Sequence, residues 1–165
     1  FYVDVGAHHP YKLSNTYLLY KLKWHGLNIE PNNDGYILLK KYRKRDINLN
    51  VGISNKNCDA TYFEFNEPAL NTFDEKIAYS HQVKHNTIIS GRRQLYLRRL
   101  DDLLDKHVSK NTEVDLLNID VEGLELSVLK SYDWSKGHIV KKGNKTDRES
   151  ALKWERENGF GANQS

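Results

Sequence analysis

Short apolar runs alternate with amphipathic segments over the first 53 residues, and this alternation is the feature that most constrains the fold. The runs at residues 1–5, 27–30 and 47–53 have the length of buried strands and end at turn-forming residues. Between them, residues 14–23 and 34–42 space their apolar side chains along one face of a helix. A strand–helix–strand–helix–strand order predicts a parallel sheet covered by helices.

The rest of the chain continues this pattern less regularly. Further strands are predicted at residues 60–65, 94–100 and 114–121, with helices at 101–107 and 124–130 and a polar stretch of weak helical signal at 67–90. After Trp134 the chain is basic and broken by glycines, with a charged helix predicted at 147–158 and only Ile139 and Val140 typical of a strand. We therefore expect an α/β fold whose sheet is incomplete on its carboxyl-terminal side.

The composition excludes several classes of protein. Hydrophobic residues make up 38% and charged residues 28% of the 165 residues, as in a soluble globular domain. No apolar run approaches the roughly 20 residues that span a membrane, and a net charge of +3 does not by itself indicate nucleic-acid binding. The single cysteine, Cys58, cannot form an internal disulfide, which favours a reducing compartment such as the cytoplasm.

The first strand ends in a turn that could approach a ligand. In the segment VDVGAHHP, Asp4 and Gly6 lie at the carboxyl end of a strand, the edge at which open α/β sheets bind ligands. Gly6 has no side chain to keep a ligand at a distance. An ordinary strand-to-helix turn explains the same residues equally well.

The second strand ends in Glu30, two dozen residues after the glycine turn. In dinucleotide-type folds an acidic residue at about this separation accepts hydrogen bonds from ribose hydroxyls. The alternative is a solvated carboxylate at a strand end. The combination of glycine turn, helix and acidic strand end favours ribose binding.

The segment LLNIDVEGLEL carries three carboxylates beside the end of a predicted strand. Asp120 and Glu122 share a face of the extended chain, so they could supply a general base or bind a divalent cation. Glu125 lies in the first turn of the next helix, where an acidic residue is expected for helix stability alone.

Two other groups of residues invite a functional interpretation that we do not favour. His81 and His85 are spaced to share a helix face, but no third metal ligand is evident, and surface positions explain them better. The arginines around Tyr96 could contact phosphates, but they are more typical of a solvated strand edge.

Four segments in order resemble the FkbM methyltransferase family: DVGAHHPYKLSNTYLLYKLKWHGLNIEPN, NLNVGIS, RRLDDLL and VDLLNIDVEGLELSVLKSYDW. The resemblance covers most of residues 1–134, which we expect to form the methyltransferase domain, and leaves 135–165 as an atypical charged tail. The commoner family pattern has glycine in place of Pro10, and His8 and His9 occupy the turn.

The resemblance implies a doubly wound, mostly parallel Rossmann-like sheet that binds S-adenosylmethionine and methylates a hydroxyl of a sugar or natural product. The implied cofactor contacts are Asp4, Gly6, Ala7 and His8 on the methionine side, Glu30 at the ribose, Asn50, Val51 and Gly52 near the adenine, and Asp120 beside the methyl group. Asp120 is the first choice as catalytic base, with Glu122 or His9 behind it. The expected partner is thus a small-molecule or glycan acceptor, with neither nucleic acid nor a membrane span.

Two other functions remain open at this point. A nicotinamide-dependent oxidoreductase could use the same kind of fold, although the full Gly-x-Gly-x-x-Gly spacing is absent. A non-catalytic nucleotide-binding module with a degenerate site would account for the atypical tail.

Overall fold

The computed structural model describes residues 1–136, 138 and 139, and its centre is a four-stranded parallel sheet. The strands are β1 (Tyr2–Val5), β2 (Gly26–Ile29), β3 (Ile47–Leu49) and β7 (Leu116–Ile119), in the order β3-β2-β1-β7. From β1 the chain proceeds to β2 and β3 on one side and later returns to β7 on the other. The strand order therefore reverses at β1, where open α/β sheets form a ligand-binding crevice.

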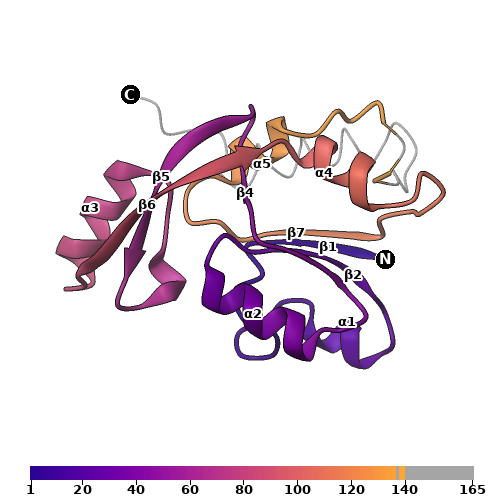
Figure 1. Ribbon diagram of the computed structural model, residues 1–165, viewed down its shortest axis with the longest axis horizontal. Coiled ribbons are helices and arrows are strands. Elements are labelled where there is room, and N and C mark those ends of the chain that lie inside the picture. The colour runs from indigo at the N-terminus through magenta and orange to yellow at the C-terminus, as the bar shows by residue number, and fades with distance from the viewer. Residues whose placement is uncertain (137, 140–165) are drawn as a thin grey trace, which may run out of the picture.

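Helices cover both faces of this sheet (Figure 1). The helices α1 (Tyr17–Lys21) and α2 (Asn33–Tyr42) lie on one side, while α4 (Leu100–His107) and α5 (Glu125–Lys130) lie on the other. This arrangement confirms the doubly wound α/β fold. It also explains why all residues of β1 and β2 are buried, since neither face of these strands meets solvent.

The main core forms between the sheet and the second helix layer. Val3, Val5, Leu27 and Ile29 of the central strands cluster with apolar side chains of α4 and α5, among them Leu100. In α4 the buried positions Leu100, Leu103 and Leu104 follow helical spacing, which is the amphipathic pattern that the sequence shows. Packing thus holds the loops at the carboxyl ends of the strands on a rigid base.

A second, smaller sheet departs from the sequence prediction. It consists of β4 (Gly52–Ile53), β6 (Ile89–Arg98) and β5 (Cys58–Phe65), with β5 and β6 antiparallel. The strand predicted at 47–53 is therefore two strands in two sheets. The Asn50 side chain explains the break, since its Nδ2 donates to the backbone oxygens of Glu30 (2.8 Å) and Pro31 (3.0 Å) and turns the chain there.

Residues 58–98 form a single excursion from the main sheet, which we call the insertion. Besides β5 and β6 it contains the short 3-10 helix η1 (Pro68–Leu70) and the helix α3 (Glu75–Lys84). These two helices fall in the stretch predicted to have only weak helical signal. Figure 1 shows α3 beside the strands β5 and β6 at one end of the molecule. The Asp74 carboxylate caps α3 by accepting from the backbone nitrogens of Lys76 and Ile77.

The end of the described chain lies beside the residues that precede β7. Val114 forms a parallel bridge with Ile139, which the sequence predicted as part of a further strand. The helix predicted at 147–158 lies outside the described residues. Among the helices that the structure describes, none is long and apolar enough to cross a membrane.

Candidate functional site

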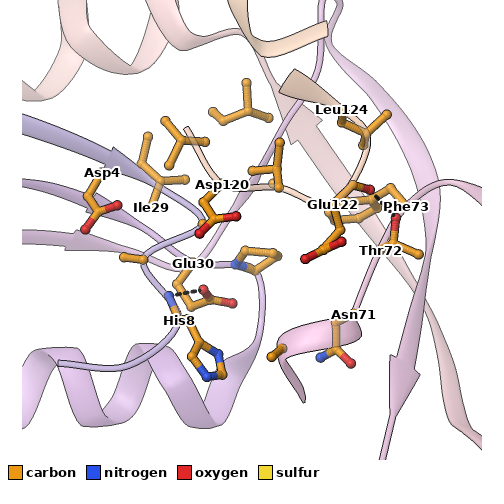
Figure 2. Close-up of a pocket in the computed structure, with 18 of the residues that line it drawn as sticks. Asp4, His8, Ile29, Glu30, Asn71, Thr72, Phe73, Asp120, Glu122 and Leu124 are labelled. Carbon is orange, nitrogen blue, oxygen red and sulfur yellow. Dashed lines mark hydrogen bonds between the residues drawn. The ribbon is translucent and has the colours of Figure 1, made fainter. Parts of the chain in front are cut away.

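A cleft lies at the carboxyl ends of β1, β2 and β7, between the main sheet and the insertion (Figure 2). Its lining brings together most of the residues singled out from the sequence: Asp4, Gly6, Ala7, His8, Glu30, Val51, Gly52, Asp120 and Glu122. His9 and Asn50 are not part of the lining. The opposite wall contains Tyr62, Asn71, Thr72 and Phe73 of the insertion, which the sequence analysis did not identify.

Glu30 is a buried carboxylate at the end of β2, with 5% of its surface exposed. One oxygen accepts a hydrogen bond from the backbone nitrogen of His8 and the other from that of Asn32, each at 2.7 Å. Burial raises the pKa of Glu30 from its ordinary value of 4.5 to about 7, although these two hydrogen bonds oppose the shift. Each carboxylate oxygen can accept a further hydrogen bond, so the group can still bind a ligand.

The glycine turn approaches protein backbone rather than open space. Gly6 has a φ of +82°, and a Cβ atom there would collide with the carbonyl oxygen of Asp120. The backbone nitrogens of Gly6 and Ala7 both donate to the oxygen of Ile29, at 2.9 and 3.2 Å. Glycine is therefore required to bring the ends of β1 and β7 together, and these two amides already have acceptors.

Asp4 is buried beneath the turn, and both of its oxygens are occupied by neighbouring side chains. The Thr16 hydroxyl donates to one at 2.6 Å and the Asn118 amide to the other at 2.9 Å. Burial is the main cause that raises the pKa of Asp4, against these hydrogen bonds. The carboxyl group thus links α1, β1 and β7 at the base of the cleft.

This network continues to a buried guanidinium that the sequence analysis missed. Arg43 is 1% exposed; it donates to the Thr16 hydroxyl at 2.9 Å and to the Tyr2 hydroxyl at 2.6 Å. Its Nε forms a 2.9 Å ion pair with Asp46. A chain of charged and polar groups therefore runs from Asp46 through Arg43 and Thr16 to Asp4.

Asp120 and Glu122 reach the cleft from the loop after β7 (Figure 2). Asp120 is exposed, and the Asn15 amide donates to its Oδ2 at 3.4 Å. Glu122 has a φ of +42°, an unfavourable conformation for a residue with a side chain, and the Thr72 hydroxyl donates to its backbone oxygen at 3.1 Å. Strained residues are found where surrounding contacts hold them, often at functional sites.

Glu125, by contrast, behaves as the helix interpretation predicts. It is exposed at the start of α5, and its carboxylate accepts a 3.2 Å hydrogen bond from the nearby backbone nitrogen of Gly123. Its position in the first turn explains it without a ligand.

His81 and His9 differ from their expected positions, whereas His85 is exposed, as expected. His81 is buried rather than on the surface; its Nδ1 lies 3.2 Å from the oxygen of Leu70 and its Nε2 lies 3.9 Å from the Glu122 carboxylate. His9 accepts hydrogen bonds at Nδ1 from the backbone nitrogens of Tyr11 and Lys12, and burial lowers its pKa. Among the described residues no group of three or more His, Cys, Asp or Glu side chains is arranged to hold a metal ion.

Comparison with known proteins identifies one family. The family model described as a methyltransferase FkbM domain matches residues 4–160, a range that includes the whole cleft. No curated protein and no solved structure gives a significant match.

Proposed function

The chain belongs to the FkbM methyltransferase family, and we propose that its cleft binds S-adenosylmethionine and directs the methyl group to a hydroxyl of a sugar or natural product. The cleft lies where the strand order reverses at β1, the usual ligand crevice of such sheets. The observation that carries the proposal is the buried carboxylate of Glu30 in this crevice. Its two oxygens match the two hydroxyls of a ribose, and each retains a free acceptor position.

The remaining lining residues suit the other parts of such a cofactor. Val51 and Gly52 follow β3 and would contact the adenine. Gly6, Ala7 and His8 would contact the methionine part of the cofactor by van der Waals packing. Their backbone amides would not bind it, because each already donates a hydrogen bond within the protein. Asp4 would act mainly by fixing this turn.

The chemistry would depend on proton transfer and on positioning. S-adenosylmethionine supplies an electrophilic methyl group on its sulfonium sulfur. We assign Asp120 as the base that accepts the proton of the acceptor hydroxyl, because its carboxylate is exposed in the cleft. Glu122 is the second candidate, with His81 3.9 Å behind it. The walls of the cleft would hold the acceptor oxygen in line and exclude water.

Two further assignments belong to the same proposal. A divalent cation at Asp120 and Glu122 is the alternative to a base, and chelation distinguishes the two. The single cysteine supports a location in a reducing compartment, the cytoplasm.

Methyl-transfer assays test the proposal. The protein is incubated with methyl-labelled S-adenosylmethionine and mixtures of sugars and hydroxylated natural products, and labelled products are identified by mass spectrometry. We expect methyl ethers that form roughly 100-fold more slowly with the Asp120→Asn variant. Thermal shift assays with S-adenosylhomocysteine and NAD accompany them. Stabilisation by NAD alone would favour an oxidoreductase, and cofactor binding without transfer to any hydroxyl would favour a non-catalytic module.

A further inference from the structure

Asn71 presents an amide donor in the insertion wall of the cleft. Its Oδ1 accepts a 2.7 Å hydrogen bond from the backbone nitrogen of Phe65, at the end of β5. Because only the oxygen of the amide can accept this bond, the orientation of the side chain is fixed and Nδ2 is the other group. Among the described residues, Nδ2 is buried and has no hydrogen-bond acceptor in regular geometry.

The surroundings of Tyr62 show that this part of the insertion lies near Glu30. Tyr62 is 3% exposed, lines the cleft and packs against Phe73 with ring centroids 4.6 Å apart. Burial and then the charge of Glu30 raise the pKa of the Tyr62 hydroxyl, whereas the neighbouring Asn71 amide lowers it. The hydroxyl of Tyr62 and the amide of Asn71 therefore lie on the opposite wall from the carboxylate of Glu30, as Figure 2 shows for Asn71.

We propose that Asn71 binds the adenosine half of the cofactor, with Nδ2 donating a hydrogen bond to a ribose oxygen or an adenine ring nitrogen. This inference rests on the proposed function, in which Glu30 holds the ribose. A ligand at Glu30 would extend toward Asn71, and its oxygens and ring nitrogens are acceptors. The donor is already shielded from water, so little of its solvation is lost when a ligand atom reaches it.

The same contact gives the insertion a role in binding. The main sheet would contribute the carboxylate that accepts from the ribose, and the insertion would contribute a donor. Because one wall would accept a hydrogen bond from the ligand and the other would donate one to it, the two contacts together would fix the orientation of the ligand in the cleft.

The test compares two asparagine-to-aspartate variants by calorimetry. Asn71→Asp keeps the oxygen that accepts from Phe65 and removes the donor. Asn66→Asp is the matched control, because the exposed Asn66 also accepts a backbone hydrogen bond in the insertion, from Ile88 at 3.2 Å, and lies outside the cleft lining. Asn71→Ala removes the donor without adding charge. Thermal unfolding of each ligand-free variant checks that it is folded.

S-adenosylhomocysteine and 5′-methylthioadenosine are the probes. We expect Asn71→Asp to weaken the binding of both by about tenfold or more, Asn71→Ala to weaken both to a smaller extent, and Asn66→Asp to leave both unchanged. Unchanged binding by the folded Asn71 variants would overturn the inference while the proposed function stands. If the Asn71 variants bind S-adenosylhomocysteine more weakly but 5′-methylthioadenosine as tightly as the wild type, the donor contacts the amino-acid end of the cofactor, and the inference is wrong. A wild-type protein that binds neither probe would contradict the proposed function itself.

Discussion

The backbone nitrogen of His8 donates a 2.7 Å hydrogen bond to the carboxylate of Glu30, which joins the turn after β1 to the end of β2 (Figure 2). His8 adopts a φ of +52° in making this contact, an uncommon conformation for a residue with a side chain. The residue proposed to hold the ribose therefore also holds the turn that would follow the methionine part. Binding of a cofactor at Glu30 would therefore be coupled to the shape of this loop.

Glu30 should make the stability of the ligand-free protein depend on pH. Its pKa is about 7 in the folded chain and near the ordinary 4.5 when unfolded, so the folded state binds more protons between these values. The contribution of Glu30 is then fully present below about pH 4.5 and is lost as the pH rises through 7, up to about 3 kcal/mol. Urea unfolding from pH 5 to 8 measures it. The Glu30→Gln variant should show a shallower slope, and equal slopes would contradict the assignment.

Gly6→Ala should destabilise the fold itself. The added Cβ would collide with the carbonyl oxygen of Asp120, and residue 6 would have to keep a φ of +82°, which alanine disfavours. We therefore expect a loss of about 2 kcal/mol or more in the free energy of unfolding. Gly91→Ala is the control, because its Cβ would approach the flexible Glu64 side chain at 3.1 Å. If Gly6→Ala unfolds like the wild type and loses only ligand affinity, the glycine serves the ligand and not the backbone.

Arg43→Met should be strongly destabilising. The variant would leave the buried Asp46 carboxylate without its ion pair and remove hydrogen bonds to Tyr2 and Thr16, a loss of about 3–5 kcal/mol. Arg45→Met changes an exposed arginine two residues away and should cost about 1 kcal/mol or less. Denaturant titration compares the two variants. Similar small losses would show that the buried network contributes little.

Asp120→Asn should separate chemistry from binding. We expect S-adenosylhomocysteine affinity within about twofold of the wild type and methyl transfer lower by roughly 100-fold, the effect of a lost general base. EDTA should leave wild-type activity unchanged if Asp120 is a base. Activity that disappears in EDTA and returns with magnesium would instead identify a metal site.

The sequence predicted the main sheet and most of the cleft because the relevant signals are local. Apolar runs that end in glycine or an acidic residue define β1, β2 and β7, and parallel strands place their carboxyl ends at one edge. Glu30, Asp120 and the glycine turn were therefore expected near one another, and all line one cleft.

Other features depend on partners distant in the chain and left no local signal. Arg43 lies in a run of lysines and arginines typical of a solvated surface, yet its partners Tyr2 and Thr16 come from β1 and the loop before α1. The break at Asn50 depends on backbone oxygens about twenty residues earlier. Asn71 was not recognised because its neighbourhood in the sequence is polar and irregular, and only the insertion's packing brings it to the cleft.

The most direct test of the central claim is calorimetric titration of the wild type and Glu30→Ala with S-adenosylhomocysteine, at a temperature where both are folded. We predict binding of one ligand per chain by the wild type and a loss of about 1.5–3 kcal/mol in the variant, the scale of hydrogen bonds to a charged group. NAD should bind to neither. Equal affinities in the two proteins, or no binding by the wild type, would contradict a cofactor site built around Glu30.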